Sequence, residues 1–217
     1  EKATRNTVTN VLDALRAVVH LSDDVEPPLW LTTREPMTRG HVPMKNGVLD
    51  LRTGELHPAT PDLFTLSALP VDYDPKADCP EWKAFLFSLW AQDPQAVGVL
   101  QEIFGYLLSG ETNQQKIFLL VGAMRSGKGT ILRILNALLG RANVAAPTLA
   151  SLSQPFGLQP LIGKLAGLVS DARLSGRADQ EAIAERLLSV SGEDHVSIPR
   201  KFLPDFTAQL QARFVLA

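Results

Sequence analysis

The residues best suited to chemistry lie in one glycine-rich segment at positions 122–130. In order, they are Gly122, Ala123, Met124, Arg125, Ser126, Gly127, Lys128, Gly129 and Thr130. The spacing Gly-x-x-x-x-Gly-Lys is typical of a loop whose backbone N–H groups converge on a polyphosphate, with the lysine reaching the β- and γ-phosphates. Gly122 and Gly127 permit close backbone approaches that a Cβ atom would block. We therefore expect ATP to bind to this loop.

The flanking residues supply the two elements that must position such a loop. An apolar run at 117–121 has the length and composition of a buried parallel strand. After the loop, Ile and Leu residues recur at helical spacing between positions 131 and 139. The amino end of that helix adds partial positive charge where phosphate would lie. The alternative is a chance glycine turn before a core helix, and the preceding strand argues against it.

The position that usually ligates magnesium departs from this pattern. In such loops a Ser or Thr follows the lysine, whereas this chain has Gly129. Thr130 comes one position later and points about 100° away around the helix. Thr130 is therefore a candidate magnesium ligand, but the motif does not place it directly.

The composition is that of an ordinary globular protein. Of the 217 residues, 45% are hydrophobic and 20% are charged, and the formal net charge is −2. A simple surface DNA binder is usually basic, so any DNA contact would have to be local, for instance inside a ring. Cys79 is the single cysteine, which excludes an internal disulfide and fits a reducing compartment. No apolar run approaches the length of a membrane span.

Three regions are expected along the chain. They are an N-terminal helix with a β-rich segment at 1–75, a helical subdomain at 76–113 and a P-loop core at 114–217. The first region begins with an amphipathic helix at 4–21, and its Thr53-Gly54 pair predicts the turn of a hairpin. Apolar spacing in the second predicts helices at 79–90 and 95–108. The chain starts without methionine and stops inside an expected strand, so we expect it to be part of a longer polypeptide.

Several short blocks precede the loop in a fixed order. They read NGVLDL at 46–51, TGEL at 53–56, DYDP at 72–75, CPEW at 79–82 and LQEIFGYLL at 100–108. In series with the loop, these blocks resemble the helicase part of phage and plasmid primase–helicases, which is similar to the poxvirus primase–helicase. These are superfamily 3 helicases. The resemblance implies an α/β fold with an AAA+-like P-loop ATPase core, preceded by a helical subdomain and a small β-rich segment.

The same resemblance implies a second site residue, Asp171. The family's Walker B strand ends in an acid, and residues 164–171 read as an apolar strand with Asp171 at its carboxyl end, the edge where open α/β sheets bind ligands. With Lys128, Asp171 would be catalytic, and it would hold magnesium with help from Thr130. Many superfamily members have two acids here, whereas this chain has Ser170. The alternative is an exposed aspartate that simply follows a core strand.

A DNA-facing hairpin is the next feature that the family implies. The segment 191–202, SGEDHVSIPRKF, looks like this motif and follows an expected helix at 180–189. Arg200 and Lys201 would project into a central channel and contact the phosphates of a single strand. On charge alone, two adjacent cations are more often a solvated turn. Their place within the motif favours DNA binding.

Together, these features imply an ATP-dependent DNA helicase of a replicative primase–helicase, with ATP and Mg²⁺ as cofactors. Its partners would be single-stranded DNA and further copies of the chain, in a hexameric ring in the full-length protein, with no membrane partner. It would act in the cytoplasm of a bacterial host, encoded by a phage or plasmid. An isolated chain would be a weak ATPase, because a neighbouring subunit completes the site. Two alternatives stay open: a small-molecule P-loop kinase, and a non-catalytic module for oligomerisation or DNA docking, which would explain Gly129.

Overall fold

The structure is a computed structural model, and it describes residues 3–22, 25, 27–37, 40–173 and 179–217. The chain forms two compact units. One consists of Glu1–Met37 with Pro61–Thr65, and the other of Thr38–Thr60 with Leu66–Ala217. The expected limits at residues 75 and 113 both lie inside the second unit.

The described residues of the first unit form one helix and one short antiparallel strand pair. Helix α1 (Arg5–Val18) begins where the Thr4 side chain accepts a hydrogen bond from the Thr7 N–H. Strand β1 (Leu29–Trp30) pairs with β5 (Leu63–Phe64). The amphipathic helix expected at 4–21 is thus present and shorter, and none of its residues is buried.

The second unit opens with an antiparallel sheet and two helices, as the sequence predicts. The sheet has the order β2 (His41–Met44), β3 (Gly47–Asp50) and β4 (Leu56–His57), and the hairpin around Thr53-Gly54 joins β3 to β4. Helices α2 (Pro80–Trp90) and α3 (Pro94–Ser109) follow. Gly110 ends α3 with a left-handed φ of 70°, a conformation that glycine adopts without steric cost.

A four-stranded parallel sheet organises the rest of the unit. Its order is β6 (Phe118–Leu119), β11 (Arg213–Leu216), β8 (Ala166–Val169) and β7 (Val144–Ala145). Helix α4 (Lys128–Leu139) follows β6. The strand expected at 117–121 is reduced to β6, an edge strand that pairs only with β11 among the described strands. The last strand in the chain therefore lies between β6 and β8.

Both faces of this sheet are covered, which gives three layers. Alternate residues of a strand point to opposite faces, and β8 follows this rule. Ala166 and Leu168 join a cluster with residues of α2, α3 and α4, while Val169 joins a second cluster with α5 and α6. In β11, Val215 joins the first cluster and its neighbour Phe214 joins the second. This burial on both faces explains the continuous apolar run of a parallel strand.

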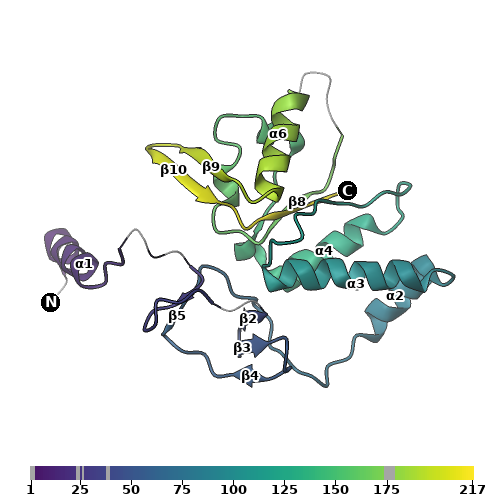
Figure 1. The fold of residues 1–217 in the computed structure, drawn as a ribbon, viewed down its shortest axis with the longest axis horizontal. Helices are drawn as coiled ribbons and strands as arrows, with labels where there is room; N and C mark the ends of the chain where they lie inside the picture. The colour runs from purple at the N-terminus through teal and green to yellow at the C-terminus, as the bar shows by residue number, and fades with distance from the viewer. Residues whose placement is uncertain (1–2, 23–24, 26, 38–39, 174–178) are drawn as a thin grey trace. The chain divides into compact units, whose positions relative to one another are not determined.

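The remaining elements connect the sheet to a hairpin. They are η1 (Arg141–Asn143), α5 (Leu149–Leu152), η2 (Gln159–Leu161), α6 (Gln180–Ser191), β9 (His195–Arg200) and β10 (Leu203–Gln209). Figure 1 shows β9 and β10 as a long antiparallel ribbon beside α6. Within the part of the chain that the structure describes, no helix is both long enough and apolar enough to cross a membrane.

Gly167 is tightly packed against residues of the second hydrophobic cluster. A Cβ atom added there would lie 2.9 Å from the Phe214 ring and 3.2 Å from Leu161 Cδ2. We predict that Gly167→Ala lowers the free energy of unfolding by about 1–3 kcal/mol through overpacking. Urea unfolding of the chain measures this change.

The matched control is Gly105→Ala in the interior of α3, where the added methyl group meets open space. Alanine favours a helix over glycine by about 1 kcal/mol, so this variant should be more stable than the wild type. Equal effects of the two substitutions would contradict the described packing of β8.

Candidate functional site

The glycine-rich segment lies between a strand and a helix, in the order that the sequence predicts. It leaves β6, turns through residues 122–127 and enters α4 at Lys128. Gly127 caps the helix with a left-handed φ of 89°, and a Cβ atom there would lie 3.0 Å from both Leu89 and Phe85 of α2. At Gly122 an added Cβ would lie 2.7 Å from Ser126 Oγ. Gly127 is therefore required by its backbone conformation and by its close contacts with α2, whereas a side chain at Gly122 would displace only the Ser126 hydroxyl.

The Lys128 ammonium group lies inside the curl of the loop. Its Nζ donates to the carbonyl oxygens of Gly122 at 2.7 Å and Ala123 at 3.0 Å, and contacts Ser126 Oγ at 3.5 Å. These contacts direct one positive charge toward the residues that precede the helix. The amino end of α4 adds partial positive charge at the same place. The arrangement attracts an anion on electrostatic grounds.

A cleft of about 310 Å³ adjoins the loop. Gly122, Ser126 and Lys128 form its polar side. Its apolar side comes from the end of α2, the residues around β6 and the first turn of α4, namely Leu89, Trp90, Leu119, Leu120, Val121 and Ile131. A small cleft with a few polar groups beside apolar side chains is typical of a ligand site.

Asp171 lies at the same edge of the sheet as the loop. It follows the carboxyl end of β8, and the loop follows the carboxyl end of parallel β6. Backbone hydrogen bonds at this edge link Leu120 N–H to Leu216 and Ala217 N–H to Val169. Because β11 separates the two strands, β6 and β8 are roughly 10 Å apart. No contact joins Asp171 to Lys128 among the described residues. The two side chains therefore lie at the same edge of the sheet without touching each other.

Asp171 has a partner for which no role was expected, Arg173. The Arg173 guanidinium donates through Nε at 2.8 Å and through Nη2 at 2.5 Å, and the Arg173 backbone N–H donates at 3.2 Å. These hydrogen bonds lower the pKa of Asp171 to about 2, and those from the Arg173 side chain have the largest effect. The carboxylate is therefore ionised at physiological pH. Both side chains are largely exposed, and an exposed ion pair is easily exchanged for another ligand.

Thr130 lies on the first turn of α4 and is already engaged. Arg133 Nη2 donates to its Oγ1 at 2.9 Å. Gly129, at the usual position of the magnesium ligand, is exposed and offers no side-chain oxygen. The described residues also contain no group of three His, Cys, Asp or Glu side chains that could hold a metal ion. A cation at this edge would be bound by Asp171 and by oxygens of a ligand in the site. Mg²⁺ is commonly bound in this way, by one or two carboxylates and substrate phosphates.

Arg200 and Lys201 lie at the end of the β9–β10 hairpin. Arg200 pairs with Leu203, so Lys201 and Phe202 form the two-residue turn. The Arg200 guanidinium lies 5.3 Å from the centre of the Phe206 ring, and its Nε donates to the Pro204 carbonyl at 2.8 Å. Lys201 Nζ lies 5.2 Å from the centre of the Phe202 ring. The sequence thus located both cations on a hairpin, and the structure adds aromatic rings beside each.

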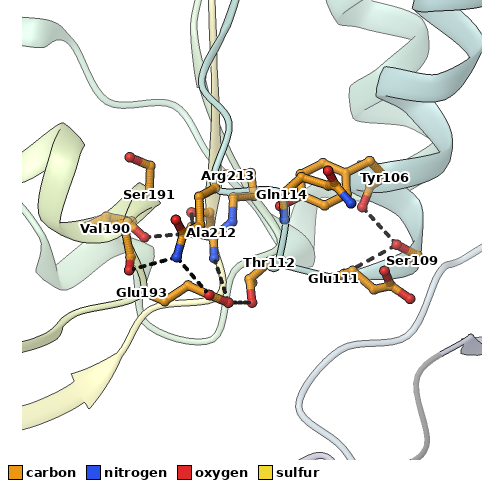
Figure 2. Close-up of polar contacts among 12 residues, drawn as sticks. Tyr106, Ser109, Glu111, Thr112, Gln114, Val190, Ser191, Glu193, Ala212 and Arg213 are labelled. Carbon is orange, nitrogen blue, oxygen red and sulfur yellow. Dashed lines mark hydrogen bonds and ion pairs between the residues drawn. The ribbon is translucent and has the colours of Figure 1, made fainter.

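The base of the hairpin is tied to the central sheet by Arg213, which sequence reasoning missed. Arg213 opens β11 and its side chain is 1% exposed. Its Nη1 donates to the Val190 carbonyl at 2.7 Å, and its Nη2 lies 3.9 Å from Glu193 Oε1 (Figure 2). Nε and Nη2 have no hydrogen-bond partner among the described residues. The only sequence signal was a lone cation at the start of an apolar strand.

Glu193 is therefore a structural residue of the α6–β9 turn and not part of the loop edge. Its carboxylate accepts a hydrogen bond from the Thr112 hydroxyl (Figure 2). It also accepts one from Gln115 Nε2 at 3.2 Å. Thr112 and Gln115 belong to the connection between α3 and β6. Glu193 faces the amino end of β11, whereas the glycine-rich loop and Asp171 lie at the carboxyl ends of the parallel strands.

Comparisons with known protein families match the chain in two parts. Residues 1–91 match the family described as "D5 N terminal like". Residues 120–217 match the "Family of unknown function (DUF5906)". A relative from Marchantia polymorpha, "Uncharacterized mitochondrial protein ymf21", is 26% identical over 125 residues, an alignment that covers 52% of this chain and 69% of the relative.

Solved structures of the NrS-1 C-terminal region share the fold. The apo structure of residues 305–718 matches with a TM-score of 0.55 and 14% identity, and covers 96% of this chain. Two A-form apo structures of the same region give TM-scores of 0.52 and 0.53 at 14% and 15% identity. The chain spans 47% of each of these structures, about half their length.

These findings agree with the sequence prediction of an α/β fold and of a relation to primase–helicases. The chain has a mixed α/β fold similar to the NrS-1 C-terminal region. The "D5 N terminal like" match supports a relation to phage and plasmid primase–helicases, in agreement with the resemblance seen in the sequence.

The Glu193–Arg213 pair leads to a stability prediction. Glu193→Gln removes the charge that faces a buried guanidinium, and we expect a loss of roughly 3 kcal/mol in the free energy of unfolding. Adding Arg213→Met to this variant should recover much of the loss, because no buried charge then remains. Urea unfolding of the single and double variants measures both effects.

Asp194→Ala is the matched control, since this neighbouring acid is exposed, and it should change stability by less than about 0.5 kcal/mol. Strictly additive losses in the double variant would contradict the pairing of Glu193 with Arg213.

Proposed function

We propose that this chain is the ATPase part of a replicative primase–helicase, a superfamily 3 helicase with an AAA+-like P-loop core. ATP binds to residues 122–130, and its hydrolysis drives movement on single-stranded DNA. The working form is a homo-oligomeric ring, hexameric in the full-length protein, in which a neighbouring subunit completes each nucleotide site. The relation to primase–helicases supports the biological setting of this proposal.

One observation carries the ATPase assignment: the order of the parallel strands. The sheet order β6-β11-β8-β7 brings the glycine-rich loop and Asp171 to one edge, with a single strand between them. Lys128 supplies a positive charge on the loop side of this edge, and Asp171 supplies an ionised carboxylate on the β8 side. Ligands of open α/β sheets bind at such carboxyl edges.

The residues of this edge suit phosphoryl transfer. Catalysis of this reaction depends mainly on positioning and on stabilising the charge of the transferred phosphoryl group. Lys128 and the amino end of α4 would neutralise phosphate charge. Asp171 fits Mg²⁺, because it is an exposed hard oxygen ligand that stays ionised. A bound Mg²⁺ would neutralise charge on the phosphates. To bind the metal ion, Asp171 would have to break its ion pair with Arg173.

The hairpin supplies the proposed DNA contact. Its strands lead into the amino end of β11, the end away from the loop edge. Arg200 and Lys201 lie at the turn, where phosphates of a single strand can reach both cations. Two focused cations are consistent with a chain whose overall charge is −2. β11 therefore links the proposed nucleotide site to the proposed DNA contact.

Two substitutions at the loop edge test the ATPase assignment. In the full-length protein, Lys128→Ala should lower phosphate release by roughly 100-fold or more, since it removes a charge that faces the phosphates. Asp171→Asn should lower kcat while nucleotide affinity changes little, because the amide keeps the shape and loses the charge that orders the metal. The measurements are phosphate release with and without single-stranded DNA, and titration with a fluorescent ATP analogue.

The control is Lys164→Ala, which removes a lysine that bonds to the Ala142 carbonyl and not to the loop. Wild-type hydrolysis in Lys128→Ala would refute the loop assignment. DNA-stimulated hydrolysis by the wild type supports the helicase, phosphorylation of a small acceptor would favour a kinase, and inactivity of the full-length wild type would favour a non-catalytic module.

A double substitution tests the DNA contact. Arg200→Ala with Lys201→Ala should weaken binding to single-stranded DNA and leave basal ATP hydrolysis unchanged, because the turn lies away from the loop edge. Each lost phosphate contact should lower the slope of log affinity against log salt by about 0.7. Fluorescence anisotropy at several salt concentrations measures the slope.

The matched control removes two exposed lysines elsewhere, Lys45→Ala with Lys76→Ala. It keeps the net charge of the double variant and should retain the wild-type slope. If Arg200→Ala with Lys201→Ala also retains that slope, the hairpin does not contact DNA.

A further inference from the structure

Phe202 occupies an unusual place for a large apolar residue. It is 93% exposed, and no other described aromatic side chain is as exposed. It is the second residue of the β9–β10 turn, with a left-handed φ of 63°. Turns prefer Gly or Asn at such a position, because a Cβ atom makes this conformation costly. Phe202 therefore combines a strained backbone conformation with a large exposed apolar surface.

The turn that carries Phe202 is anchored to a neighbouring element. The Lys201 backbone N–H donates to Gln159 Oε1 at 3.1 Å, which fastens the turn to η2. Behind the turn, Ile198 is fully buried in the second hydrophobic cluster. The ring therefore projects from an anchored hairpin and not from a loose loop. An outlier of this kind, fixed by its surroundings, is a reason to look for a function.

The neighbours of Phe202 indicate the chemistry of its partner. Lys201 Nζ lies over one face of its ring, so a base would stack on the other face, and Arg200 is the last residue of β9 before the turn. An aromatic face beside cations is the combination that proteins use for single-stranded nucleic acid, where bases stack on rings and phosphates meet cations. An apolar protein pocket or an uncharged lipid surface would match the ring but would leave the two adjacent charges without a counterpart.

We infer that Phe202 is a stacking platform for an unpaired base of the single strand that Arg200 and Lys201 contact. The inference rests on the proposed function, because it takes the hairpin as the DNA contact. It adds a different kind of recognition. The cations attract any polyanion, whereas the ring requires a base. Stacking of this type tolerates every base, since each has a π-face.

The test compares two oligonucleotides of equal length, oligo(dT) and its abasic counterpart, with the full-length protein. Phe202→Ala should weaken binding to oligo(dT) by roughly 5- to 150-fold, as found for loss of one base–aromatic stack. It should leave binding to the abasic oligonucleotide unchanged, because that probe offers phosphates without bases. Phe202→Trp should keep the wild-type affinity for oligo(dT). Leu203→Ala is the matched control, an adjacent apolar residue that is 57% exposed.

Three outcomes would overturn the inference: unchanged oligo(dT) binding by Phe202→Ala, equal losses on the two oligonucleotides, or an equal loss in Leu203→Ala. The variants at Arg200 and Lys201 keep the proposed function separate. If they weaken binding to both oligonucleotides while Phe202→Ala has no effect, the hairpin contacts DNA through charge alone. If they also have no effect, the DNA contact itself is wrong.

Discussion

The insertion of β11 between β6 and β8 is the constraint on which the rest of the second unit depends. Its parallel pairing with both neighbours brings the carboxyl ends of β6 and β8 to one edge. At the same time, Phe214 and Val215 point to opposite faces and join the two hydrophobic clusters. A slip of one residue would exchange these faces. The register of one short strand therefore determines both the layers and the edge that holds Lys128 and Asp171.

The same strand connects two sites that lie far apart in the sequence. Its amino end carries Arg213, which holds the Glu193 turn at the base of the hairpin. Its carboxyl end lies between the loop and Asp171. A buried guanidinium is costly unless it is paired, and here the pairing joins α6, β9 and the connection before β6. In the proposed motor, this arrangement gives a physical connection between the DNA contact and the nucleotide edge.

Sequence reasoning succeeded where the signal was local. The turn at 122–127, helices α2, α3 and α4 and the β3–β4 hairpin follow from spacing, caps and turn residues. It could not give the strand order, because that depends on pairing between residues almost a hundred positions apart. It missed the Arg213–Glu193 pair because the sequence does not show how the β9–β10 hairpin brings these two residues together. The Arg173 contact with Asp171 is only two residues away, but an exposed arginine has many possible partners.

The most direct test of the account is a crystal structure of the protein with Mg²⁺ and a non-hydrolysable ATP analogue. In the proposed ATPase, the γ-phosphate contacts Lys128 Nζ, and the metal ion lies between the phosphates and Asp171, with Arg173 displaced from the carboxylate. A nucleotide bound elsewhere, or a nucleotide on the loop with Asp171 still paired to Arg173 and no metal ion near it, would contradict the account.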